Sequence, residues 1–322
     1  LDVRRLGQAL FPDSGVPARL LARVANVDVR YARAITSSFH RSPFPPSLAY
    51  QLALGGVERF RREQGVLAAS ASQTTTLGVQ SGVALPLGLR VTASYQEGTG
   101  VTWLLRNAVQ VPIRTESRAW PVLSATWSLS PGRTALGRVL SGLTARLGYR
   151  ERESGSEHVG VSPAGAPTLS RTTERALAPS LSLTWAGGLL TTFDAAYARN
   201  DRLAAGSLFR TTHDTWSAAA SVTLRPPAAL ARLPSGIRVN ARYAYNENVT
   251  CLRPAGGDAC VPHVDSRQTQ AHLTLDTDFP PNISAGFQMA YVLNDERQAN
   301  RKNAQLVLTA FVNLTSTVGQ LR

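Results

Sequence analysis

Residues 77–96 of the chain read LGVQSGVALPLGLRVTASYQ, and two rows of alternating side chains in this stretch decide the fold class. Most odd positions on both sides of a tight Pro86-Leu87-Gly88 connection are apolar, and the even positions are small or polar. Because successive Cβ atoms of a strand point to opposite faces, this period of two predicts an antiparallel hairpin. One face of the hairpin is apolar, as in half of a soluble sandwich or in the wall of a membrane barrel.

The same alternation recurs along the rest of the 322-residue chain. Together with the opening pair it predicts about thirteen strands of roughly 8–14 residues, the length that tilted membrane-crossing strands require. Amphipathic helices are confined to short pieces in the connections. The other apolar rows lie in residues 27–31, 48–54, 123–129, 143–149, 181–185, 193–197, 216–224, 237–243, 271–275, 283–291 and 306–312.

Short and long connections alternate between these strands, as they do in outer-membrane barrels with short periplasmic turns and long external loops. We therefore predict an all-β, transmembrane antiparallel β-barrel, or a large segment of one, in the outer membrane of a diderm bacterium, with membrane lipid as its partner. Tight connections are expected at 86–88, 186–188 and 279–282, and long polar loops near 97–118, 152–175, 199–212, 246–267 and 293–303.

The whole chain, 1–322, is predicted to be a single barrel segment. No secretory leader and no evident ending are visible, and the strand count is odd. Because unpaired strand edges are costly in hydrocarbon, we interpret the segment as a fragment of a larger closed wall.

Three connectors share a layout that opens with proline, continues with a short Ala/Leu/Arg helix and enters a strand that ends in tyrosine. They span 12–31, 131–149 and 226–243, and the first is predicted to hold a connector helix at 12–26. This layout creates one conflict. If 12–31 rises from the periplasm, counting strands places Pro86–Gly88 on the wrong side, unless a strand near 57–69 is uncounted or the first connector is not equivalent.

Aromatic side chains fall at or near the ends of the apolar rows. Tryptophan and tyrosine prefer the depth at which hydrocarbon meets headgroups, although aromatic residues at strand ends also occur in soluble cores. The predicted interface aromatics are Trp127, Trp185, Trp216, Tyr95, Tyr149, Tyr197, Tyr243 and Tyr291.

The polar rows carry serine, threonine and arginine, which suits a water-filled or plugged lumen. Two roles remain open for the arginines: they attract anions within about 8 Å of the wall at physiological salt, or they form a ladder of hydrogen bonds that stiffens it. Acidic members of these rows are fewer, mainly Asp28, Asp194 and Asp276. The predicted lumen-facing basic residues are Arg90, Arg146, Arg150, Arg238 and Arg242.

The net charge of +13 would suit a nucleic-acid partner, but the arginines form no cluster, so we predict no nucleic-acid binding. The two cysteines, Cys251 and Cys260, lie nine apart within the predicted 246–267 loop. This placement favours a disulfide formed in an oxidising compartment, with two free thiols as the alternative. A metal site is disfavoured because only His263 lies nearby and structural zinc takes four ligands.

The histidines are the candidates for enzyme chemistry. His213-Asp214 resembles the His–Asp pair of outer-membrane aspartyl-type proteases, which needs a facing acidic pair, and Asp201 is the one close candidate. His272 lies on a polar row and could serve as a general base, but no nucleophile can be assigned to it. His40 and His158 complete the set with His263. We predict no catalytic residue, no cofactor and no metal site.

At Ser42–Gly56 the chain reads SPFPPSLAYQLALGG, and with the Tyr-containing strands and helix-bearing turns it resembles the SprA/Sov family of giant outer-membrane barrels. Those proteins form the translocon of the type 9 secretion system and serve gliding motility. The resemblance implies a very large barrel that passes folded cargo, with plug or secretion-system proteins as partners. The predicted function is therefore a protein translocation or passage channel. An outer-membrane hydrolase and a structural or porin-type barrel are the alternatives.

Overall fold

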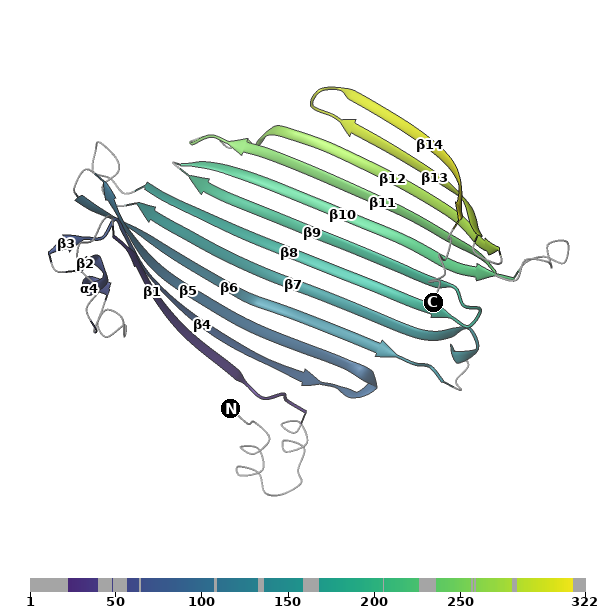
Figure 1. Ribbon diagram of the computed structural model, residues 1–322, viewed down its shortest axis with the longest axis horizontal. Helices are drawn as coiled ribbons and strands as arrows, with labels where there is room; N and C mark the ends of the chain where they lie inside the picture. The colour runs from purple at the N-terminus through teal and green to yellow at the C-terminus, as the bar shows by residue number, and fades with distance from the viewer. Residues whose placement is uncertain are drawn as a thin grey trace, which may run out of the picture.

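The computed structural model describes residues 23–39, 48, 57–63, 65–106, 109–132, 136–158, 168–204, 206–225, 236–255, 257, 259–279 and 283–314. Twelve strands form one antiparallel sheet, in which neighbours in the chain pair throughout and β1 pairs with β4 (Figure 1). The strands of this sheet are β1 (Asp28–Ser38), β4 (Ser70–Ala84), β5 (Leu89–Arg106), β6 (Val109–Leu129), β7 (Leu140–His158), β8 (Thr168–Trp185), β9 (Leu190–Ala204), β10 (Ser207–Leu224), β11 (Ile237–Arg253), β12 (Val261–Phe279), β13 (Ile283–Glu296) and β14 (Arg301–Leu314).

The predicted all-β antiparallel architecture is confirmed, and twelve of the thirteen predicted strands belong to this sheet. The thirteenth, 48–54, lies outside the described residues apart from Leu48, which has helical backbone geometry. Asp28 pairs with Gln80 and Ser38 with Ser70, so the chain leaves β1 and enters β4 at the same end of the sheet. The residues before β1 and the Pro86–Gly88 turn therefore share the opposite end, which removes the conflict over the first connector.

The strands are longer than predicted, reaching 21 residues in β6 and 19 in β7 and β12. The expected long loops are therefore wrong over much of their length. Between β5 and β6 only 107–108 remain, between β9 and β10 only 205–206, and between β13 and β14 only 297–300. The predicted 246–267 loop is strand up to Arg253 and again from Val261, and 152–175 is strand up to His158 and again from Thr168.

The tight turns lie at the other end of the sheet. The 3-10 turn η1 (Pro86–Gly88) joins β4 to β5, with Leu87 at φ 62° and Gly88 at φ 78°. A Cβ on residue 88 would clash with the backbone carbonyl of Ser128. Position 88 therefore requires glycine both for its positive φ and for this close contact. The connector before β7 holds a second 3-10 turn, η2 (Leu136–Arg138).

The predicted helix at 12–26 falls mostly outside the described residues. Its last part is not helical, because Val24 forms an isolated antiparallel bridge with Val83 and the residues after it are extended toward β1. The connector at 226–243 is described only from residue 236 onward.

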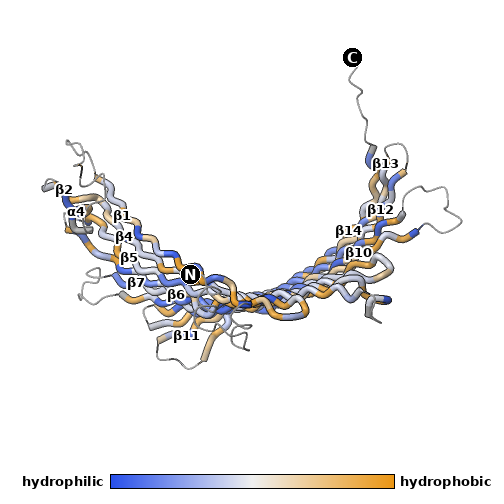
Figure 2. Tube along the Cα trace, turned by 90° about the horizontal axis from the view of Figure 1, so that it is seen from below, coloured by the Kyte–Doolittle hydropathy of each residue, from blue (hydrophilic) through white to orange (hydrophobic). Residues whose placement is uncertain are grey.

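The sheet curves into an open arc (Figure 2). Its edges are β1 and β14, which do not pair with each other among the described residues. The 34.5 kDa chain exposes 21933 Å², against about 13,000 Å² expected for a compact monomer of this mass. Both faces of the sheet are therefore largely uncovered.

One corner of the sheet has a small packed core. There the helix α4 (Val57–Arg61) and the two-stranded ribbon of β2 (Arg62–Glu63) and β3 (Val66–Leu67) cover the end of β4, and Phe60, Ala68 and Ala71 are buried. No helix among the described residues is long and apolar enough to cross a bilayer.

Candidate functional site: a wall with two faces

The register of the sheet aligns the alternating rows of neighbouring strands. On every strand of the sheet, the residues on the face of Ala145 and Leu147 of β7 are called the apolar row. The residues on the opposite face, which carries Arg146 and Arg150, are called the polar row. Ala145 lies opposite Trp127 of β6 and Leu181 of β8, so apolar residues meet across strands. Leu147 is 46% exposed and Phe193 is 42% exposed. The apolar row thus forms a continuous uncovered surface.

This surface is continuous over the half of the strands that adjoins the tight turns, called here the turn-proximal half. In the other, distal half the same row becomes charged on β6–β10, whereas on β5 it carries Glu97 and then Thr99, Val101, Trp103 and Leu105. On β7 the row runs Leu143, Ala145, Leu147 and Tyr149, and then continues with Glu151, Glu153, Gly155 and Glu157. The backbone pairing with β8 continues without interruption through this change.

Acidic and basic side chains pair across the strands of the distal half. Arg175 of β8 donates to Glu151 of β7 at 2.8 and 3.0 Å, and Arg171 bonds Glu153. Asp201 of β9 accepts from Arg210 of β10 at 2.7 Å and from Arg199 at 2.9 Å. Such cross-strand pairs stabilise a sheet whose outer surface faces water.

The carboxylate of Asp201 in the distal half accepts hydrogen bonds from two arginines. Burial by itself would raise the pKa of this carboxyl, but the hydrogen bonds from Arg210 and Arg199 outweigh burial and hold the pKa below its usual range. The charged form is therefore the one that the two arginines stabilise.

A repeated Tyr-x-Glu motif marks the boundary between the two halves. The tyrosine hydroxyl donates to the glutamate two residues later at 2.6 Å in Tyr95-Glu97, 3.2 Å in Tyr149-Glu151 and 3.0 Å in Tyr245-Glu247. Each glutamate also lies opposite an arginine of the next strand, in the pairs Glu97–Arg118, Glu151–Arg175 and Glu247–Arg267. The ring ends the apolar surface and the carboxylate begins the charged one.

The eight predicted interface aromatics all lie on the apolar row, but most of them are not at strand ends. Trp127 and Trp185 adjoin the tight turns, where their indole N–H groups donate to the Leu87 carbonyl and the Thr191 hydroxyl at 3.0 Å each. The other six lie in mid-strand, because the strands continue beyond them: Trp216, Tyr95, Tyr149, Tyr197, Tyr243 and Tyr291.

Sequence reasoning missed Tyr245. Its ring centroid lies 6.0 Å from that of Trp216, which in turn lies 4.9 Å from Tyr243, so the three form one cluster on β10 and β11. The Tyr-x-Glu repeat, visible three times in the sequence, is the signal that could have identified it.

The five predicted basic residues all lie on the polar row, in two different situations. Arg238 bridges Asp276 and Asp278, with 3.0 Å to the latter, and Arg150 pairs with Glu174. Among the described residues no ion pair joins Arg90, Arg146 or Arg242 to an acidic side chain. The ladder therefore accounts for two of these arginines, and the other three have no acidic partner within the part of the chain that the structure describes.

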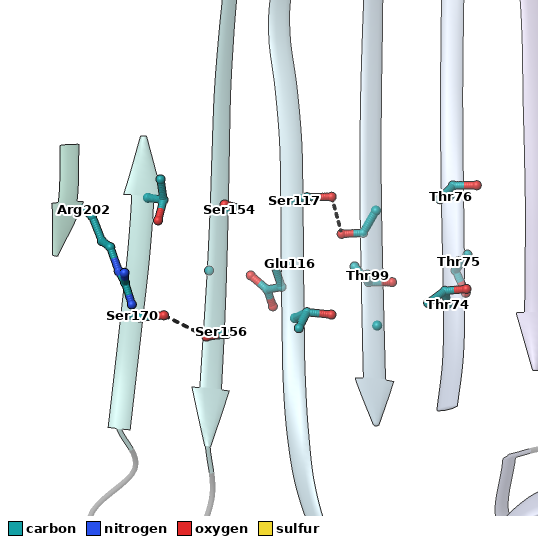
Figure 3. A pocket seen from close by; sticks show the side chains of 15 residues that line it. Thr74, Thr75, Thr76, Thr99, Glu116, Ser117, Ser154, Ser156, Ser170 and Arg202 are labelled. Atoms are coloured by element: carbon teal, nitrogen blue, oxygen red, sulfur yellow. Dashed lines mark hydrogen bonds between the residues drawn. The ribbon is translucent and has the colours of Figure 1, made fainter. Parts of the chain in front are cut away.

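In the distal half the polar row of β4–β8 contains a stretch of hydroxyl groups and glycines. Thr76, Gly98, Ser117, Ser154 and Thr172 follow one another in register across five strands, and Arg202 of β9 ends the series. Figure 3 shows this stretch, with Glu116 and Arg202 at its shallow depression of about 450 Å³, and Ser156 and Ser170 are hydrogen-bonded at 2.8 Å. Charges border the stretch, because Arg152 lies opposite Glu174 on the same row.

Cys251 and Cys260 are joined by a disulfide, with 5.5 Å between their Cα atoms. Cys251 lies near the end of β11 in the distal half, directly after a register shift at Thr250. Cys260 immediately precedes β12. The bond therefore closes the far end of the β11–β12 hairpin.

The histidine sites do not assemble. His213 lies on the polar row opposite Asn248, whereas Asp201 and Asp214 lie on the other face. His272 lies opposite Arg242 and Ala290, and His40 is outside the described residues. Within the described part of the chain no three histidine, cysteine or carboxylate side chains group as metal ligands.

No protein-family model and no curated protein matches the sequence. Two solved structures align along most of the chain. The β domain of the Bordetella autotransporter BrkA is 8% identical, with a TM-score of 0.28, over 91% of this chain and 99% of its own. The transport unit of the autotransporter AIDA-I from Escherichia coli is 11% identical, with a TM-score of 0.26, over 97% and 96%. Scores this low mean that the strands do not superpose as one body, so neither function nor barrel shape is taken from them.

Proposed function

We propose that this sheet is part of the wall of a β-barrel in the outer membrane of a diderm bacterium, and that the barrel is a passage channel for polypeptides. In this proposal the apolar row of the turn-proximal half faces lipid and the polar row faces a water-filled lumen. The distal half then projects beyond the membrane as a paired, charged collar.

Membrane lipid is the partner that the apolar row supports. Uncovered side chains such as Leu147 and Phe193 need an apolar environment, and two levels of aromatic rings bound the surface that they form. From Trp185 to Leu177 the apolar row of β8 spans eight residue steps of about 3.3 Å, or about 26 Å. These residues reach the lower end of the roughly 9–11 residues with which a tilted strand crosses an outer membrane.

The open arc is the observation that carries the proposal of a wide passage. The diameter of a barrel grows with its number of strands. Twelve strands that leave the arc open require further strands for closure, and lipid tolerates no unpaired edge. The closed barrel is therefore wider than one built from twelve strands. On β4–β8 the polar row has a stretch of serine, threonine and glycine, which suits a moving polypeptide better than a ladder of charges does.

Translocation of the type 9 secretion kind, with plug or secretion-system partners, is a narrower version that rests only on the resemblance at 42–56 and in the Tyr-containing strands and helix-bearing turns. No observation favours the hydrolase alternative.

Conductance of the intact protein in planar bilayers tests the proposal. A wide lumen predicts large single-channel steps and passage of unfolded peptide from one chamber to the other. Small steps with exclusion of peptide would instead identify a porin-type barrel for small solutes. Absence of the intact protein from the membrane fraction would reject the channel altogether.

The two groups of arginines provide a matched pair of variants for the same recording. Replacing Arg90, Arg146 and Arg242 by glutamine removes charge without an acidic partner, so anion preference across a KCl gradient should fall. Replacing Arg150 together with its partner Glu174 by glutamine removes two charges that cancel, so selectivity should change little. Equal effects from the two sets would contradict the assignment of the polar row to the lumen.

A further inference from the structure

The apolar row has a hollow over β8–β13. Alanines at 218 and 220 of β10, 241 of β11 and 271 of β12 line a groove of about 630 Å³ and are its smallest side chains on this row. Ala220 lies directly opposite Ala241, so two alanines meet there. The larger side chains of Phe193 and Leu273 line the groove beside these alanines.

The groove ends at the boundary between the halves. There the rings of Trp216, Tyr243 and Tyr245 cluster, and Arg267 holds Glu247 at 2.7 Å just beyond them. The side chains of the apolar row that line the groove are apolar except for the hydroxyls of Thr191 and Tyr243, and Thr192, Arg242 and His272 of the polar row contribute to the lining. A hollow of this shape lies in the bilayer if the proposed function holds, and contact atoms are lost wherever it stays empty.

We propose that this alanine-lined groove holds one acyl chain of a membrane lipid in a fixed position. The chain lies along the strands between Phe193 and Leu273, with the glycerol end beside the Trp216 cluster, where amphipathic rings suit the transition to headgroups. This site rests on the proposed orientation of the apolar row toward lipid. It adds an ordered lipid where the rest of the apolar row meets lipids that exchange freely.

Fluorescence of Trp216 in the intact protein, reconstituted with Trp216 as the single tryptophan, tests the site. The vesicles contain phospholipid with a rising fraction of chains brominated near the glycerol end, since bromine quenches only on contact. A second protein keeps Trp127 alone and reports ordinary contact with lipid. We expect the quenching of Trp216 to rise in proportion to the brominated fraction, because one chain occupies the site. Trp127 meets several exchanging chains, so its quenching should rise more steeply at low brominated fraction.

Two variants of the Trp216 protein separate the groove from general packing. Ala220→Leu fills part of the groove and should convert the quenching curve of Trp216 to that of Trp127. Ala125→Leu adds the same side chain to the apolar row of β6, outside the groove, and should leave it unchanged. Mass spectrometry of lipid retained after detergent exchange gives a second reading, in which only Ala220→Leu loses the bound lipid.

The outcomes distinguish the site from the proposed function. Equal quenching of Trp216 and Trp127, unchanged by Ala220→Leu, overturns the site and leaves the lipid-facing wall in place. Failure of bromine to quench either tryptophan overturns both. Capture of a lipoprotein anchor in place of a phospholipid would appear in the mass spectrum and would also overturn the site as stated.

Discussion

The two halves of the strands share one backbone and one register but differ in the chemistry of their outer row. On β7 the turn-proximal half presents Ala145 and Leu147, and the distal half presents Glu151 and Glu153. Pairing with β8 is the same in both. Backbone hydrogen bonds and alternation therefore build the wall, and the medium outside the wall selects the side chains. The difference gives each half its own expected response to substitution.

The largest expected difference comes from placing a charge on the outer row of each half. Leu147→Arg puts a guanidinium on the apolar row of β7, which should destabilise the protein in a bilayer by about 2–4 kcal/mol if that residue lies near the midplane. Thr173→Arg puts the same group in the distal half of β8, opposite Glu153 and Asp201, and should cost about 1 kcal/mol or less. Denaturant titration of the intact protein in lipid vesicles measures both.

Similar losses from Leu147→Arg and Thr173→Arg would mean that the two halves meet the same solvent. Leu147→Ala in the same vesicles serves as the control. It shortens the same side chain without adding a charge, so it should cost less stability than Leu147→Arg.

The disulfide should stabilise the distal half alone. Its nine-residue separation corresponds to about 2–3 kcal/mol of loop-closure entropy. In Cys251→Ser/Cys260→Ser we expect amide exchange to accelerate at the far end of the β11–β12 hairpin, around Thr250 and Val261. Exchange near Ile237 and Phe279, at the turn-proximal end, should stay unchanged. Uniform acceleration along both strands would contradict a division into halves of separate stability.

The boundary between the halves also limits what the sequence could predict. Alternation of apolar and polar residues identified every described strand of the large sheet, because the apolar row of each turn-proximal half follows the pleat. The same rule failed beyond Tyr149 and Tyr245. There both rows are polar, as in Arg150–Glu157, and a polar run without an apolar row is the pattern expected of a loop.

What the sequence pattern missed is which residues lie opposite each other on neighbouring strands. Glu151 indicates a strand only once Arg175 is known to lie opposite it, and a local pattern cannot detect a pair that is 24 residues apart in the chain. The same applies to the candidate site. The arginines of the polar row were identified from alternation, but which of them are neutralised depends on neighbours such as Glu174 and Asp278, which only the register reveals.

A smaller effect is expected from a charge pair of the distal half. Asp201→Asn removes the carboxylate that Arg199 and Arg210 share, which should cost about 1 kcal/mol at neutral pH. Because the pKa of Asp201 is lower in the folded state than in the unfolded state, its contribution is complete above the unfolded value of about 4 and is lost as pH falls through the folded value. Wild type and variant should therefore converge in acid, and a gap that persists at low pH would assign the loss to packing.

The smallest expected effect tests the boundary itself. Tyr149→Phe keeps the ring at the edge of the apolar surface and removes only the hydroxyl that donates to Glu151, so the unfolding free energy should fall by about 0.5 kcal/mol. Tyr197→Phe is the matched control, because Tyr197 lies on the same level, opposite the Leu177 that also faces Tyr149, yet is followed by Arg199 where the motif has glutamate. It should change stability by less than Tyr149→Phe does. Equal losses from both variants would mean that the tyrosine hydroxyls stabilise the protein through hydrogen bonds to water at the boundary, and that the carboxylate of the motif adds nothing.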